Sequence, residues 1–302
     1  MKYNEDARLD TSEVQDTRSS RLPSTRSGQA ALGGGGLGVV GLLVVLLVNV
    51  LGGGGGNSVD LGSVLGGLGQ SGGPATADNS QVQQECKTGA DANAKVDCAA
   101  VANIDSIQAY WKSELPKLGK QYVAVPTVWF SGQVSTGCGA ATSDSGPFYC
   151  PTDKRVYIDL SFYEDLQKQF GAEGGLFVNA YVLAHEYGHH VQDIKGDLSG
   201  ESAQEGAQGR SVRTELQADC YAGVWARHAT ETGYIVGLTK ADVSDALDAA
   251  AAVGDDRIQS ASGGHVTPET WTHGSSAERD HWFTAGYNGG SAASCDTFSG
   301  KI

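Results

Sequence analysis

The sequence lacks several features that would assign it to a common class of protein. It contains no C-x-x-C pair, which argues against zinc ligation by its six cysteines. No internal repeat has the length used by solenoids or propellers. Basic residues are few, 21 lysines and arginines against 35 aspartates and glutamates, and the formal charge is −14. This acidic balance argues against binding to nucleic acid and against electrostatic adhesion to anionic lipid.

Charged residues are also missing from a long N-terminal stretch, residues 27–59. Inside it lies an apolar run, Leu37–Leu51, with polyglycine on both sides. With its flanks the run gives about 22 helical residues, enough at ~1.5 Å per residue to cross a ~30 Å hydrocarbon core. We therefore predict a single transmembrane helix over residues 30–52. A cleaved signal peptide is the alternative, although the polar leader is long and no clear A-x-A site follows.

The distribution of basic residues predicts an orientation for this helix. Arg18, Arg21 and Arg26 precede it, and the next basic residue is Lys87. The positive-inside rule then predicts a single-pass cell-membrane protein with a cytoplasmic N-terminus, the lipid bilayer as partner of residues 30–52, and all later residues outside the cytoplasm. The predicted parts are a disordered cytoplasmic tail, a transmembrane helix, a Gly/Ser-rich tether and one folded domain, over residues 1–29, 30–52, 53–81 and 82–302.

All six cysteines follow the predicted span, and an even number of them on the exported side suggests disulfides. Local spacing favours Cys86–Cys98 and Cys138–Cys150, which leaves Cys220–Cys295. This pairing is one of many that six cysteines allow, so the connectivity stays open at this point.

The apolar pattern of the predicted domain indicates several helices and few strands. Predicted helices span residues 101–118, 176–194, 212–228, 241–253 and 275–287. Two strands, rich in β-branched and aromatic residues, are predicted over 122–130 and 156–162. The Gly/Ser/Asp-rich stretch between them, 131–153, is expected to be a disulfide-stapled loop. This mixture favours an α+β fold.

The segment that carries chemistry is the pattern His185-Glu186-x-x-His189 inside the helix predicted over 176–194. Histidines four residues apart project from one helix face, one turn apart, and can bind one zinc ion at ~2.0–2.1 Å. Glu186 lies beside the first ligand, where it can act as general base toward water. A chance match is the alternative, but the pattern sits in a long helical segment with the apolar positions that a buried helix needs.

A third zinc ligand is predicted at Glu215, in the next helix along the chain. A catalytic zinc usually has three protein ligands and one open position for water, and Glu215 would complete a His-His-Glu set. Asp219 lies one helical turn beyond Glu215 and is placed to accept the second ring N–H of a ligand histidine. The alternative for Glu215 is a solvated helix residue.

His273 is a candidate for stabilising the oxyanion of a tetrahedral intermediate, because it lies just before a predicted helix N-terminus. A structural histidine is an equal alternative. Tyr187 is a second candidate for the oxyanion role, although it is expected to face the packing side of the ligand helix. Arg279, a few residues after His273, is expected to anchor a carboxylate.

The other histidines are expected to play no part in catalysis. His190 lies about 100° around the helix from His189, so it is not expected to bind the same metal. His228 is expected to cap the helix predicted over 212–228. His265 and His281 are expected on the surface.

These residues resemble the bacterial "putative neutral zinc metallopeptidase" family, single-span proteins with a Gly-rich N-terminal anchor. The resemblance covers nearly the whole chain, and its motifs lie at residues 128–132, 139–151, 156–162, 185–192, 215–220 and 273–275. The spacing of Glu215 and Asp219 is also similar to that of thermolysin-like gluzincins. The resemblance implies a zincin-like domain with one zinc ion on His185, His189 and Glu215. It also implies that an edge strand over 156–162 pairs with extended substrate.

The predicted function is that of a membrane-anchored zinc endopeptidase acting on a peptide or protein, with Glu186 as catalytic base. Two alternatives remain: a non-catalytic, zinc-stabilised scaffold of the cell envelope, and a zinc hydrolase of a non-peptide amide. Glu186 argues against the scaffold, because a structural zinc site needs no base and usually has four protein ligands. The sequence gives neither the substrate nor the oligomeric state.

Overall fold

The structure is a computed structural model that describes the chain except for residues 20–75, 169–170, 173, 200–203 and 262–264. Its α-helices are α3 (Ser80–Glu85), α4 (Gly89–Ala94), α5 (Val96–Glu114), α6 (Phe162–Lys168), α7 (Leu176–Lys195), α8 (Arg210–His228), α9 (Lys240–Ala252), α10 (Asp255–Ala261) and α11 (Ser276–Gly289). Its strands are β1 (Lys2–Tyr3), β2 (Val14–Asp16), β3 (Thr127–Trp129), β4 (Gln133–Thr136), β5 (Gly139–Thr142), β6 (Phe148–Cys150), β7 (Arg155–Ile158) and β8 (Ile235–Gly237). Short 3-10 helices complete it: η1 (Thr11–Glu13), η2 (Leu115–Leu118), η3 (Ser143–Ser145), η4 (Ala229–Glu231), η5 (Pro268–Thr270) and η6 (Ala292–Ser294).

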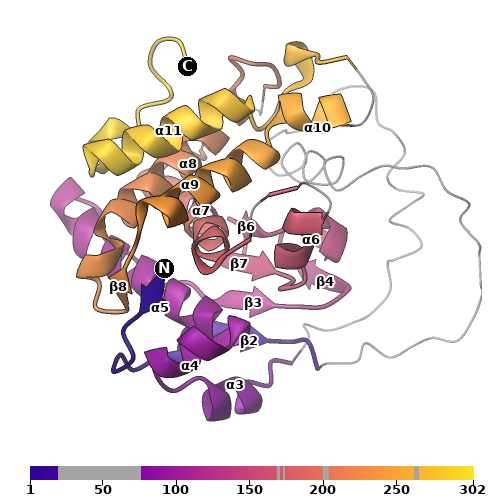
Figure 1. Cartoon of the computed structure of the whole chain (residues 1–302). Coiled ribbons are helices and arrows are strands. Elements are labelled where there is room, and N and C mark those ends of the chain that lie inside the picture. Colours follow the sequence, from indigo (N-terminus) through magenta and orange to yellow (C-terminus); the bar gives the residue numbers. More distant parts are fainter. Residues whose placement is uncertain (20–75, 169–170, 173, 200–203, 262–264) are drawn as a thin grey trace, which may run out of the picture.

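Helix α7 lies at the centre of the molecule (Figure 1). It packs against α8 and α9 on one side and against α5 and β6 on the other, and α11 covers α8. The main sheet has the strand order β2-β3-β7-β6, in which β2, β3 and β7 run parallel and β6 runs antiparallel to β7. Strands β4 and β5 form a hairpin, and β1 pairs with β8. The described residues thus form the predicted α+β domain with a small sheet.

Glycines end helix α7 and let it approach α8 closely. Gly196 ends α7 in the left-handed conformation, with φ 91°, which glycine adopts without a Cβ clash. Gly188 lies inside α7, where a Cβ would come within 3.0 Å of the Ala218 carbonyl oxygen on α8. The missing side chain therefore lets the backbones of α7 and α8 come close at the level of the His185-Glu186-x-x-His189 pattern.

The prediction of a disordered N-terminal tail is wrong for residues 1–19. Strand β2 extends the main sheet through parallel pairing with β3, and β1 pairs with β8. Tyr3 and Val14 are fully buried, and the Tyr3 hydroxyl donates a hydrogen bond to Asn103 on α5 at 2.9 Å. Pairing with distant strands orders a segment that its own composition would leave unfolded.

The predicted membrane topology must also be corrected. Residues 30–52 and most of the predicted tether over 53–81 lie outside the described part of the chain, and no helix within the described part has the length and apolarity to span a bilayer. Strand pairing gives a second reason, since one crossing after residue 29 would separate β2 from its partner β3 by a membrane. The predicted single-pass location, with N-terminus and domain on opposite sides, is therefore wrong.

The predicted strands differ from those observed. Strand β3 occupies only three residues of the range 122–130, and β7 ends at Ile158. Asp159 then caps a turn by accepting hydrogen bonds from the backbone N–H and hydroxyl of Ser161, at 3.0 and 2.9 Å, so Phe162 begins α6. Strand β7 also lies between β3 and β6. It is therefore an interior strand, and the edge strand beside α7 is β6.

The cysteines form three disulfides, Cys86–Cys98, Cys138–Cys150 and Cys220–Cys295, which is the pairing that local spacing favours. The second one staples the segment between β4 and β6, as expected for the loop over 131–153. The third joins α8 to the C-terminal segment.

Candidate metal centre

Helix α7 brings the two imidazoles of its motif side by side. The rings of His185 and His189 have centroids 4.9 Å apart and stand at 90° to each other. Both Nε2 atoms face α8, where one Glu215 carboxylate oxygen lies 3.1 Å from His185 Nε2 and the other lies 3.5 Å from His189 Nε2. The three side chains therefore converge from two packed helices, as the predicted ligand set requires.

The donor set fits a zinc ion. One ligand atom from each of His185, His189 and Glu215 lies within 4.8 Å of the others. Tetrahedral zinc with bonds of ~2.0–2.1 Å needs ligand atoms about 3.3 Å apart, which is close to the two measured nitrogen–oxygen distances. Two imidazoles and a carboxylate are ligands that zinc favours. The His189 side chain is 12% exposed, so the site keeps contact with solvent.

Electrostatics at the site favour a bound positive charge. Burial opposes the imidazolium form of His185, but the carboxylates of Asp219, Glu215 and Glu186 outweigh burial and raise the pKa of His185 to about 10. Burial also opposes ionisation of Glu215, yet the neighbouring imidazoles hold the pKa of Glu215 well below its usual range. Three buried carboxylates, those of Glu186, Glu215 and Asp219, thus lie around the ligand imidazoles, an environment that favours a bound cation.

Asp219 fixes the orientation of the His185 ring through its Nδ1 atom, on the opposite side of the ring from Glu215. Its Oδ1 atom lies 2.8 Å from His185 Nδ1 and accepts a hydrogen bond from the Tyr181 hydroxyl at 2.6 Å. Arg279 on α11 donates to both oxygens of Asp219, at 2.8 and 3.0 Å. Because Nδ1 is engaged by a carboxylate, Nε2 of His185 is left to face Glu215. Arg279 has the carboxylate-anchoring contact expected of it.

Glu186 is buried beside the ligand histidines. Burial raises the pKa of Glu186, and the imidazoles of His185 and His189 oppose this shift. Val156, the β7 partner of Tyr149, donates its own backbone N–H to Pro126, so this pair of β6 and β7 is not hydrogen-bonded. The backbone N–H of Tyr149 on β6 is directed toward Glu186 and lowers the pKa of its carboxyl. This N–H points away from β7, so the free edge of β6 faces the metal centre.

The loop that carries His273 packs against α8, the helix of Glu215, because a Cβ on Gly274 would meet the side chains of Val212 and Leu216, at 3.1 and 3.2 Å. The Nδ1 atom of His273 is 2.9 Å from the Thr272 hydroxyl oxygen and 3.5 Å from Asp255 Oδ1. Asp255 Oδ2 accepts hydrogen bonds from the backbone N–H groups of Thr272, His273 and Gly274, at 2.7, 2.7 and 3.0 Å. Asp255 therefore holds the loop that carries His273. The sequence analysis missed Asp255, because nothing in its local sequence links it to a histidine 18 residues later.

The position of Tyr187 is incompatible with a role in stabilising the oxyanion. It is fully buried, and its hydroxyl contacts Thr127 at 2.9 Å and donates to the Val125 carbonyl at 3.1 Å. It thus faces the packing side of α7, as expected.

The other histidines make structural or surface contacts. His190 is buried between the Tyr149 hydroxyl, at 3.0 Å, and the Val123 carbonyl, at 2.8 Å. His228 stacks on Tyr110 at the end of α8, and His265 and His281 are exposed.

Comparison with known proteins identifies a family. The family described as "Putative neutral zinc metallopeptidase" matches residues 1–298. "Uncharacterized protein YpfJ" of Escherichia coli K12 is 39% identical, over 98% of this chain and 98% of its own length. An uncharacterized protein of Mycobacterium tuberculosis H37Rv is 54% identical, over 71% of this chain and 75% of its own length. No solved structure gives a significant match.

Proposed function

The chain belongs to the family described as "Putative neutral zinc metallopeptidase", and from this premise we propose that it is a zinc-dependent endopeptidase. The observation that carries the proposal is the convergence of His185, His189 and Glu215 with the buried carboxylate of Glu186 beside them. The first three side chains would hold one Zn²⁺ ion. When bound, that ion supplies Lewis acidity toward a carbonyl group and lowers the pKa of water.

Glu186 has the role of general base in this mechanism. Its buried carboxylate lies next to the ligand imidazoles, whose charges act on its pKa. From there Glu186 accepts a proton from the attacking water and passes it to the leaving amine. His273 donates a hydrogen bond to the developing oxyanion from Nε2. In this tautomer Nδ1 carries no proton and accepts a hydrogen bond from the Thr272 hydroxyl, 2.9 Å away.

A peptide substrate is supported by the position of β6. Among the described strands, β6 forms one edge of the main sheet and pairs with β7 alone. Its outer edge faces Glu186, so an extended chain that pairs with β6 would lie across the metal centre. Backbone pairing of this kind tolerates many sequences, which suits an endopeptidase with broad specificity.

Peptide hydrolysis by wild type and by the variant Glu186→Gln tests the proposal. Zinc-loaded wild type should cleave denatured casein or a fluorogenic peptide library, and a chelator should abolish cleavage reversibly. Glu186→Gln should bind zinc like wild type but lose about 10²–10⁴-fold in kcat, the usual contribution of a general base. Equal hydrolysis by both proteins, or none by zinc-loaded wild type on either substrate, would contradict the proposal. A zinc-stabilised scaffold would show the second result.

A further inference from the structure

His189 is the second histidine of the proposed metal set. Within the described part of the chain, no carboxylate bonds its Nδ1 atom as Asp219 bonds that of His185. The Nδ1 atom of His189 instead lies 2.8 Å from the side-chain oxygen of Gln192, one turn further along α7. Gln192 is fully buried. Its amide nitrogen donates to the Thr214 carbonyl at 2.7 Å and to the side-chain oxygen of Gln217 at 3.0 Å.

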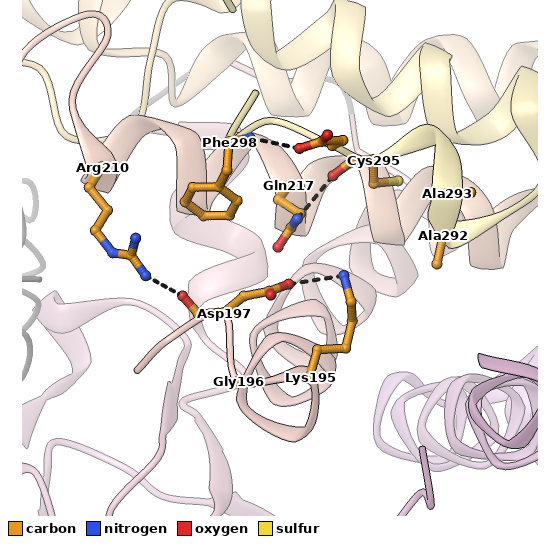
Figure 2. A pocket seen from close by; sticks show the side chains of 10 residues that line it. Lys195, Gly196, Asp197, Arg210, Gln217, Ala292, Ala293, Cys295 and Phe298 are labelled. Carbon is orange, nitrogen blue, oxygen red and sulfur yellow. Dashed lines mark hydrogen bonds and ion pairs between the residues drawn. The ribbon is translucent and has the colours of Figure 1, made fainter. Parts of the chain in front are cut away.

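Gln217 on α8 continues this chain of hydrogen bonds. Its amide nitrogen donates to the Cys295 carbonyl at 2.9 Å, and Figure 2 shows this bond at the wall of a pocket of about 480 Å³. None of the proposed metal ligands lines that pocket. The Cys220–Cys295 disulfide ties the Cys295 carbonyl back to α8. The outer end of this series of hydrogen bonds is thereby anchored to α8, the helix that carries Glu215.

The two backbone carbonyls fix the direction of every bond in this chain. A carbonyl oxygen can only accept, so the amide nitrogens of Gln217 and Gln192 must face Cys295 and Thr214. The oxygen of Gln192 then faces His189 Nδ1 and can only accept from it. His189 must therefore carry its proton on Nδ1, which leaves the lone pair of Nε2 directed at Glu215.

We propose that Gln192 and Gln217 are positioning residues for metal binding, a two-amide relay that sets the tautomer and ring orientation of His189. The inference rests on the proposed function, because it assumes a metal ion on His189 Nε2. Gln192 also bonds the carbonyl of Thr214, which directly precedes Glu215. The same amide thus holds the second and third proposed ligands in register across α7 and α8.

Zinc affinity, measured by competition with a chromophoric chelator, tests the relay without relying on activity. Gln192→Met keeps the length of the side chain and removes the amide. It should weaken zinc binding about 10–100-fold, the usual effect of removing a partner behind a metal ligand. Gln217→Met should weaken it less, because the contact of Gln192 with His189 remains. Gln108→Met is the matched control: Gln108 is equally buried but bonds Tyr122 and Val125 instead, so zinc affinity should stay at the wild-type value.

Nitrogen-15 NMR of zinc-loaded wild type, with labelled histidine, tests the tautomer in the unmodified protein. His189 should show a protonated Nδ1 and a metal-bound Nε2. Coordination of His189 through Nδ1 would overturn the relay, as would Gln192→Met binding zinc within about twofold of wild type. Failure of wild type itself to bind zinc would overturn the proposed function and the relay together.

Discussion

At the scale of single residues, helical spacing predicts the two histidines and the place of Asp219 one turn beyond Glu215, whereas other supporting contacts could not be predicted. Histidines at positions i and i+4 must share a helix face, so the sequence predicts His185 and His189 as neighbours. The partners of those side chains come from tertiary packing. Asp255 contacts the loop of His273, and Gln217 contacts Gln192; helical periodicity singles out neither residue.

The oxyanion role of His273 can be separated from metal binding by substitution. His273→Gln should lower kcat about 10²–10³-fold, because a donor aimed at the oxyanion acts mainly in the transition state. The Michaelis constant should change little. Steady-state kinetics on a fluorogenic peptide, with the zinc content of each sample checked, would measure this.

His281→Gln is the control for that experiment. His281 is exposed on α11, only eight positions from His273, and its substitution should leave kcat unchanged. An unchanged kcat in His273→Gln with full zinc content would remove His273 from the mechanism and leave it a structural histidine.

At the scale of elements, the helices could be predicted more closely than the strands. The predicted ranges 176–194 and 212–228 lie within two residues of α7 and α8 at either end, because a long apolar stripe defines a helix by itself. Strands of three residues, such as β3, have no such stripe. They exist because partner strands satisfy their backbone groups, and those partners lie far away in the sequence.

Helices α8 and α11 touch backbone to backbone, which yields a prediction for Gly286. A Cβ on Gly286 would come within 1.9 Å of the Cys220 carbonyl oxygen, and one on Gly223 within 2.1 Å of the Phe283 carbonyl oxygen. Gly286→Ala should therefore push the helices apart and lower the free energy of unfolding by about 1–3 kcal/mol or more. Urea denaturation would measure the loss.

The same variant should also weaken zinc binding, because α11 carries Arg279 and α8 carries its partner Asp219. Gly237→Ala is the matched control, since a Cβ on Gly237 meets only the Cβ of Lys2, at an ordinary 3.7 Å. Gly286→Ala with wild-type stability would show that the two helices separate without cost.

At the scale of the whole molecule, the composition of the N-terminal segment leads to a wrong prediction of disorder. Residues 1–29 are polar and charged, which predicts disorder, yet residues 1–19 form one edge of the main sheet and cover α5. Their partner strands, β3 and β8, lie more than 100 positions away in the sequence. The composition of a segment indicates how much apolar surface the segment can bury by itself. It does not indicate whether a strand far away in the sequence will form backbone hydrogen bonds with it.

An acidic cluster joins this segment to α5. Asp105 is buried and accepts a hydrogen bond from the backbone N–H of Asp10 at 2.9 Å. Burial raises the pKa of Asp105 to about 8 against that hydrogen bond, with Glu13 and Asp10 adding repulsion. Burial and repulsion from Asp10 likewise raise the pKa of Glu13 to about 7, while Gln108 and Lys112 oppose the shift.

The cluster should make stability depend on pH. Both pKa values exceed those of the unfolded carboxyls, about 4. Between about pH 4 and pH 8 the folded protein therefore holds protons that the unfolded chain has released, and the free energy of unfolding falls as the pH rises. The contribution is complete below about pH 4 and is lost above about pH 8. We expect Asp105→Asn, which can still accept from Asp10, to remove a decline on the order of 5 kcal/mol across this pH window.

Urea denaturation of both proteins at several values between about pH 5 and pH 8 measures this difference. Comparing slopes cancels the pH dependence of metal binding, because both proteins have the same metal-binding side chains. Asp6→Asn, at an exposed position of the same segment, should keep the wild-type slope. Parallel slopes for wild type and Asp105→Asn would show that Asp105 is ionised in the folded protein across this range. The N-terminal segment would then lie over a solvated carboxylate, in conflict with the burial that joins it to α5.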